Sequence, residues 1–427
     1  MRIMAILLLG AAEPLAAQEV SASYRAELWT GLETQGGEAA LSRLTLEPTL
    51  EFTGVDVTGE FVARLEVAPD ATGLGRRDGF SPASRPIGLG DDAQIEIDRV
   101  SLQWRVAGAR LTIGKQVMAW GVLDGVQVTD RFDPVRRRDF VFTEYRPERI
   151  ARWGARARGR LGGVALDLAF VPDPTVAQLA RPGDRFDPPA TRLRGGLPLV
   201  DGAPDTVFSA RNRWWADASY GGRASARLGR LAVTALAFSA PEPDPLVALG
   251  PAGPELVSPR RTLVGGTATL SAGAVVLRME AAHVPDQPVN FAPLPVGGGL
   301  VPQVGQRPRT LLGAGMDWSA PAGIFVNAQA VVDHIKADAR GLVRPETEVI
   351  ATLRAQKTLA RDTVKLSAEW LVSVREGDGA VRPAVEWQLS DSLAATFGAD
   401  LMHGDTEGLF GQFRDRSRVW LRLRVTG

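Results

Sequence analysis

Residues 56–67 read Asp-Val-Thr-Gly-Glu-Phe-Val-Ala-Arg-Leu-Glu-Val, and this stretch decides the fold class. Its side chains alternate between two kinds. One set is apolar: Val57, Phe61, Ala63, Leu65 and Val67. The other set is polar or charged: Asp56, Thr58, Glu60, Arg64 and Glu66. Because successive side chains of a strand point to opposite faces, the pattern predicts a β-strand with one apolar and one charged face.

The same alternation recurs along the chain, at 44–52, 151–161, 222–228, 349–356 and 418–425. An amphipathic helix would repeat every 3.6 residues and does not fit a period of two. Strands of a soluble sandwich are short, about five or six residues. Many segments here are longer and approach the roughly 9–11 tilted residues that cross an outer membrane.

The connections between these segments fall into two sets that alternate along the chain. The tight set lies near 54–55, 108–109, 162–163, 229–230, 272–273, 320–322, 360–361 and 390–391. The longer set, rich in Gly, Pro and charge, is 70–90, 120–148, 172–213, 241–259, 285–307 and 337–345, with shorter members near 35–40, 376–379 and 405–411. Short periplasmic turns that alternate with longer extracellular loops are typical of outer-membrane barrels. We therefore predict an all-β chain, a transmembrane antiparallel up-and-down barrel of about 18 strands, with 16 as the alternative.

Residues 1–17 have the form of a secretory signal, with Arg2 ahead of a short apolar run and Ala16-Ala17 for cleavage. Residues 18–427 then form a single barrel domain. No later segment is apolar for 18 residues, so no transmembrane helix is expected. Export without such a helix places the protein in the periplasm, outer membrane or medium, and the barrel pattern favours the bacterial outer membrane.

The composition excludes several classes of function. The chain has 427 residues with 49 basic and 49 acidic side chains, so a dedicated nucleic-acid binder is disfavoured. It contains no cysteine and only three histidines: His283, His334 and His403. Asp333-His334 is the only adjacent acid–histidine pair, and we predict no enzyme, no cofactor and no metal site.

The charged face of the strands would line the lumen. Early strands are rich in acid, whereas one strand carries four in-phase arginines: Arg152, Arg156, Arg158 and Arg160. This predicts a basic wall that faces an acidic wall and a weak preference for anionic or amphiphilic solutes. The alternative is a merely solvated wall, because only four of the basic residues are lysine and a GC-rich genome favours arginine.

The segment 120–148 is too apolar for an extracellular loop and too charged to face lipid, so we expect it to fold into the lumen. Its carboxylates and arginines would then meet at a constriction: Asp124, Asp130, Asp133 and Asp139 with Arg136, Arg137, Arg138, Arg149 and Arg152. The alternative is a structural tether, in which the same network pins the loop to the wall.

Short sequence signatures cluster around this segment: Gly114-Lys115-Gln116, Trp120-Gly121, Asp133-Pro134, Arg138-Asp139-Phe140 and Arg149-Ile150. Together they resemble a motif of proteobacterial outer-membrane barrels that are distantly similar to alginate-export porins. The resemblance implies an 18-stranded barrel with a passive or assisted transport role, and some relatives are thought to work beside inner-membrane lipid exporters. Asp133 stands where the motif usually has Asn. Val122 stands directly after Trp-Gly, where the motif often has an acidic residue.

Two functions follow. The first is a porin-like channel for small polar solutes, anions among them; the second is an export or adapter barrel for a hydrophobic or polymeric substrate. Expected partners are outer-membrane lipids and lipopolysaccharide, the barrel-assembly machinery, small solutes, and periplasmic proteins or further copies of the chain.

Overall fold

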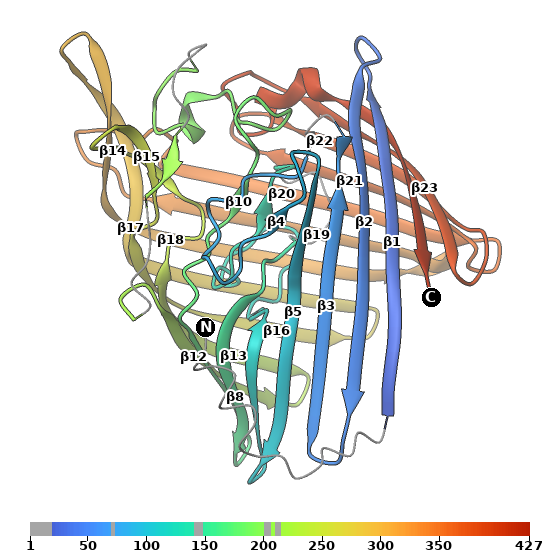
Figure 1. The fold of residues 1–427 in the computed structure, drawn as a ribbon. Coiled ribbons are helices and arrows are strands. Elements are labelled where there is room, and N and C mark those ends of the chain that lie inside the picture. Colours follow the sequence, from blue (N-terminus) through green and yellow to red (C-terminus); the bar gives the residue numbers. More distant parts are fainter. Residues whose placement is uncertain (1–18, 70–72, 141–147, 200–205, 210–214) are drawn as a thin grey trace.

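The computed structural model describes residues 19–69, 73–140, 148–199, 206–209 and 215–427, and within them the chain forms one closed antiparallel barrel (Figure 1). Its main sheet has 19 strands, of which β4 (Ile87–Gly88) is a two-residue addition beside β5, leaving 18 in the wall. The first and last wall strands close the barrel, paired from Arg25 with Thr426 to Glu33 with Arg418. The predicted fold and strand number are confirmed.

The wall strands follow one another in chain order around the barrel. They are β1 (Glu19–Glu33), β2 (Ala39–Thr53), β3 (Val57–Val67), β5 (Ala93–Val106), β6 (Ala109–Gln116), β8 (Arg152–Leu161), β9 (Val164–Val171), β12 (Ser219–Leu228), β13 (Leu231–Pro241), β16 (Arg260–Ala272), β17 (Val275–Val296), β18 (Gly299–Ala320), β19 (Ile324–Ile335), β20 (Thr347–Leu359), β21 (Val364–Ser373), β22 (Asp378–Gln388), β23 (Leu393–His403) and β24 (Arg418–Thr426).

Short elements lie in the connections. They are β7 (Arg136–Arg137), β10 (Gln178–Leu179), β11 (Val207–Phe208), β14 (Leu246–Gly250), β15 (Gly253–Val257) and the 3-10 turns η2 (Thr191–Leu193), η3 (Pro321–Gly323) and η4 (Gly411–Arg416). β7 pairs with β10, and β14 and β11 flank β15 in a small second sheet. No helix among the described residues is long and apolar enough to cross a membrane.

Tight and long connections alternate around the barrel as predicted. The turn between β5 and β6 is formed by Ala107 and Gly108, whose φ values are 49° and 79°. Two positive φ values give the mirror-image turn whose twist matches a two-residue hairpin, and Gly reaches this region without strain.

The prediction of a loop over 285–307 is wrong, because β17 and β18 continue through it as one 22-residue hairpin. Its register shifts between Val284 and Gln287 and again between Phe291 and Leu294, so Pro285 and Pro293 fall in bulges. A proline removes a ladder hydrogen bond, but it is tolerated at bulges and in a ribbon with free edges. The high Pro and Gly content therefore marks a projecting hairpin rather than an irregular loop.

The outer face of the wall is apolar. Ala281, Leu312, Val332 and Val349 occupy matched positions on β17, β18, β19 and β20. Leu312 is 53% exposed and Val332 38% exposed, which suits a belt that faces lipid.

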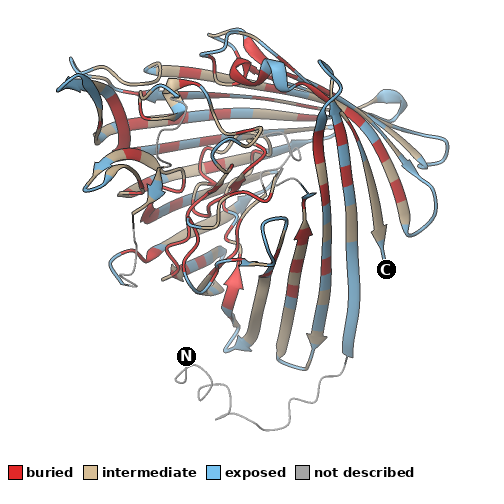
Figure 2. Cartoon of the chain, turned by 45° about the horizontal axis from the view of Figure 1, so that its top comes forward, coloured by how far each residue is buried: buried red, intermediate tan, exposed pale blue. Residues whose placement is uncertain are grey.

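The buried apolar residues gather inside the barrel rather than between two layers. The loops that lie inside the barrel carry many buried residues (Figure 2). The largest cluster joins five residues of the connection between β6 and β8 to inward-facing residues of β9, β13 and β16 to β19. The interior is therefore partly filled by the protein's own chain.

Candidate functional site

The described parts of the connection between β6 and β8, residues 117–140 and 148–151, lie inside the barrel and organise its interior. Asp130 accepts a hydrogen bond from the backbone N–H of Trp120 at 3.0 Å, and Asp133 accepts one from Met118. Short carboxylate side chains readily satisfy backbone donors in irregular segments. The two aspartates thus fix the local path of the chain on either side of Trp120.

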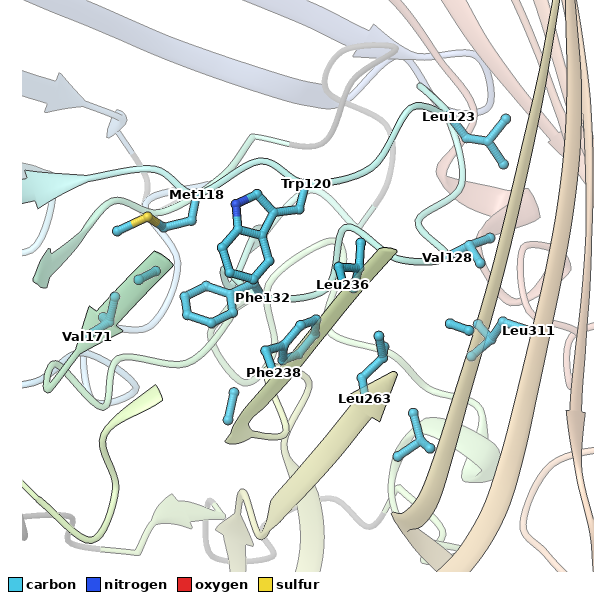
Figure 3. Packing of buried hydrophobic residues seen from close by; sticks show 14 of the residues in the cluster. Met118, Trp120, Leu123, Val128, Phe132, Val171, Leu236, Phe238, Leu263 and Leu311 are labelled. Atoms are coloured by element: carbon cyan, nitrogen blue, oxygen red, sulfur yellow. The ribbon is translucent and has the colours of Figure 1, made fainter. Parts of the chain in front are cut away.

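Two aromatic side chains anchor this segment to the wall. Trp120 and Phe132 are each 1% exposed, with their ring centroids 4.9 Å apart, and Phe132 lies 5.2 Å from Phe238 of β13 (Figure 3). The indole Nε1 of Trp120 donates to Asp167 of β9 at 3.3 Å. Full burial of such rings contributes a large apolar area and favours the docked loop.

The arginines of the second half of the loop insert into the acidic wall. Arg138 forms a two-pronged contact with Glu66 of β3, at 2.6 and 2.8 Å, and Arg136 pairs with Glu96 of β5. Glu148, at the other end of the loop, contacts both Arg136 and Arg138. Burial alone would raise the pKa of Glu148, but Arg64 and Arg136 outweigh it and hold the pKa well below its ordinary value.

Two further contacts connect the loop to neighbouring elements. Asp139 accepts a hydrogen bond from Arg43 of β2 at 2.8 Å, and Arg137 lies 3.3 Å from Asp244 after β13. Burial opposes ionisation of Asp244, yet Arg137 and Arg131 outweigh it and lower its pKa to about 2.

Among the described residues, the structure brings together three of the acid–arginine pairs expected within the loop, one of which is Arg138 and its neighbour Asp139 at 3.9 Å. Asp130 pairs with Arg149, and Asp133 lies 3.1 Å from Arg152. Burial raises the pKa of Asp133 in spite of Arg152. Asp124 instead lies 3.7 Å from Arg278 of β17. Since most of these charges are neutralised by wall residues, their contacts favour the tether interpretation, and a lining role for them stays a prediction.

The four arginines of β8 have different environments. Arg152 is 2% exposed and donates to Ser219 and to the carbonyl of Phe132, so it belongs to the loop anchor. Arg156 forms a two-pronged contact with Asp167 at 2.6 and 2.8 Å, and Arg158 donates to Gln103 at 2.7 Å. Arg160 is exposed.

Neighbouring strands extend this basic wall in register. Arg105, Arg110, Arg158, Asp167 and Arg223 occupy matched positions on β5, β6, β8, β9 and β12. Four positive charges and one negative charge therefore lie side by side on the inner face. Arg110 and Asp167 were not among the predicted lumen residues, although Arg110 lies two residues beyond a tight turn and in phase with Thr112.

The acidic side chains that were expected to face the basic wall are mostly paired with arginines. Glu47 and Glu66 are 6% and 1% exposed, and Arg64 lies between them, 2.6 Å from Glu47 and 3.8 Å from Glu66. With Arg136 and Arg138 added from the loop, the acids of β2, β3 and β5 are largely compensated. The four arginines at the matched positions of β5, β6, β8 and β12 thus outnumber Asp167 of β9.

A second basic region lies where the segments around 76–88 and 181–182 meet, and it lines an open hollow of about 750 Å³. Its charged lining residues are Arg76, Arg77, Asp78, Arg85 and Arg181. Arg181 is held by the carbonyls of Gly75 and Asp91, each at 3.3 Å. Four arginines and one aspartate leave this hollow positive.

The histidines do not assemble a reactive site. Asp333 points inward to Arg309 at 2.7 Å, whereas His334 is exposed on the opposite face beside Thr347 at 2.9 Å. Adjacent strand residues face opposite sides, so this pair cannot cooperate. Among the residues that the structure describes, no three His, Asp or Glu side chains are grouped to hold a metal ion.

Comparisons with known proteins place the fold. No family model matches the sequence, and no curated protein matches it either. OccAB2 of Acinetobacter baumannii has a similar structure, with 10% identity and a TM-score of 0.54 over 97% of this chain and 99% of that one. A BenF-like porin of Pseudomonas fluorescens Pf-5 has 9% identity and a TM-score of 0.51 over 96% and 98%.

OccK2 (OpdF) of Pseudomonas aeruginosa, solved in complex with glucuronate, gives 11% identity and a TM-score of 0.50 over 96% of this chain and 98% of that one. The resemblance to alginate-export porins stays a prediction. At these identities the likeness concerns the fold, and the chain shares the barrel fold of solved porins over nearly its whole length.

Proposed function

We propose that the protein is an outer-membrane channel of the porin type that passes small polar solutes and favours anions. The register-matched arginines of β5, β6, β8 and β12 carry this proposal. A ring of like charge on a pore wall attracts ions of the opposite sign. The barrel fold shared with porins and the apolar outer face support an outer-membrane location.

The test is ion selectivity in a planar bilayer. The full chain is refolded, and its reversal potential is measured under a potassium chloride gradient for the wild type and for Arg110→Gln with Arg158→Gln. We expect the reversal potential of the wild type to lie toward the equilibrium potential of chloride. The reversal potential of the double variant should shift toward the equilibrium potential of potassium. Arg230→Gln with Arg361→Gln is the matched control, because both arginines lie exposed in tight turns outside the lumen.

An unchanged reversal potential in the Arg110 and Arg158 variant would contradict the anion preference. Absence of current from a folded barrel would contradict the channel itself and favour the adapter or export barrel. Heat-modifiable migration on a gel checks that each variant is folded.

A further inference from the structure

Glu280 of β17 is a buried carboxylate on the inner wall, several strands away from β6, where the internal loop departs. It is 3% exposed and contacts the loop beside Leu123 and Val128, two members of the buried apolar cluster. Among the described residues, no arginine or lysine forms an ion pair with it. Because a buried charge without compensation is very costly, its hydrogen bonds have to stabilise it.

Those hydrogen bonds all come from the tip of the loop. Oε1 accepts the backbone N–H groups of Val122 and, at 2.7 Å, Leu123. Oε2 accepts the backbone N–H of Thr129 at 2.8 Å and its hydroxyl at 2.6 Å. Four donors thus converge on one carboxylate, an arrangement that binds anions strongly.

The surrounding residues fit this contact closely. A Cβ at Gly121 would lie 2.9 Å from the Glu280 carboxylate and 2.6 Å from the Cβ of Asp130, so the Trp-Gly pair requires glycine here. On the wall, a Cβ at Gly313 or Gly315 would lie 2.5 or 2.7 Å from the methyl groups of Leu123. The two glycines of β18 therefore form a socket for that side chain.

The tip is also attached on its far side. The backbone N–H of Gly125 donates to Gln329 of β19 at 3.3 Å, and Asp124 lies 3.7 Å from Arg278. The loop thus spans the interior from the end of β6 to β17, β18 and β19. Glu280 supplies the strongest set of contacts at this distant attachment.

We propose that Glu280 is the positioning residue that holds the loop tip across the lumen and so sets the width of the passage. This inference rests on the proposed channel function. Gln in its place offers one acceptor oxygen and turns an NH₂ group toward backbone donors, so part of the hydrogen-bond set is lost. Ala leaves the three N–H groups and the hydroxyl of the tip as an empty receptor for a small carboxylate.

The experiment measures unit conductance of the refolded full chain with Glu280→Gln, Glu280→Ala and the wild type. We expect both variants to conduct at least about twofold more, because a released tip widens the narrowest section of the pore. Glu51→Gln is the matched control: it removes one exposed inner-wall carboxylate of β2, far from the loop along the chain, and should conduct like the wild type.

Rescue by formate separates positioning from a general loss of structure. Sodium formate should return Glu280→Ala toward the wild-type conductance, while neutral formamide should not, since only the anion reproduces the carboxylate. The wild type and Glu51→Gln in the same solutions correct for the mobility of formate itself.

Wild-type conductance in both folded Glu280 variants, or an absence of formate rescue, would overturn the inference. If the wild type passes no current, the proposed function fails instead. In that case hydrogen exchange at Val122, Leu123 and Thr129 still decides the positioning role. Faster exchange in Glu280→Ala supports it, and unchanged exchange overturns it.

Discussion

The contact between Arg138 and Glu66 allows a quantitative prediction about what holds the loop inside the barrel. Their side chains are 2% and 1% exposed and share two hydrogen bonds, at 2.6 and 2.8 Å. Removal of one partner of such a buried pair costs about 3–5 kcal/mol. Without Arg138, the buried Glu66 would keep the weaker contact with Arg64 at 3.8 Å. Arg138→Met should therefore release the loop far more often than the wild type does.

Native-state hydrogen exchange measures this opening directly. The amides of Arg136 and Ile150, bonded to the carbonyls of Glu148 and Pro134, report on the loop. A cost of about 3–5 kcal/mol predicts exchange about 100- to 4,000-fold faster in Arg138→Met. The double variant Arg138→Met with Glu66→Gln should recover much of this loss, because no uncompensated charge remains.

The control pair is Arg414 and Asp415, which are 49% and 70% exposed and 3.7 Å apart. Arg414→Met should alter exchange at its own segment by no more than about fivefold, since exposed pairs contribute about 0–1 kcal/mol. A double variant that opens as readily as Arg138→Met, or a single variant that matches the control, would refute the reasoning.

Two other predictions concern the apolar cluster around Trp120 and the titration of Asp184. Trp120→Ala should destabilise the docked loop by about 3–5 kcal/mol through loss of a fully buried ring, measured as faster exchange at the amides of Met118 and Ile150; unchanged exchange would show that the apolar cluster does not hold the loop. Burial raises the pKa of Asp184 to about 6, above its ordinary 3.8, so the folded segment favours the neutral acid. The stabilisation that neutral Asp184 gives to the folded segment is complete below about pH 4 and is lost as the pH rises through about 6. After correction for intrinsic rates, residues 181–187 should exchange faster at pH 7.5 than at pH 5 in the wild type, and Asp184→Asn should remove this difference; a persisting difference would place the titration elsewhere.

Alternation along the chain was sufficient to predict the barrel. A period of two is a local property, so stretches such as 56–67 identify their own strand and its two faces without knowledge of any partner. The alternation of tight and long connections then set the strand number. Pro and Gly misled the prediction at 285–307, because Pro285 and Pro293 fall in bulges and the pairing continues past them.

The partners of the loop could not be predicted from the same pattern. Arg138 lies 2.8 Å from Glu66, 72 residues earlier, and only 3.9 Å from its immediate neighbour Asp139. Glu280 alternates with apolar neighbours in its strand, but nothing local distinguishes it from a solvated wall residue. Its role depends on three backbone N–H groups about 150 residues away, and backbone donors leave no mark in side-chain periodicity.

The loop inside the barrel also imposes an order on assembly. Its partners lie on both sides of it in the chain: Glu66 and Glu96 come before it, while Glu280 and Gln329 follow 151 and 204 residues after Thr129 and Gly125. The earlier contacts can form once β5 is in place, but the tip has no seat until β17, β18 and β19 have joined the wall. Contacts of such separation form slowly. The interior therefore cannot consolidate before β17, β18 and β19 have formed, and a half-built wall would hold an undocked tip whose apolar side chains have nowhere to pack.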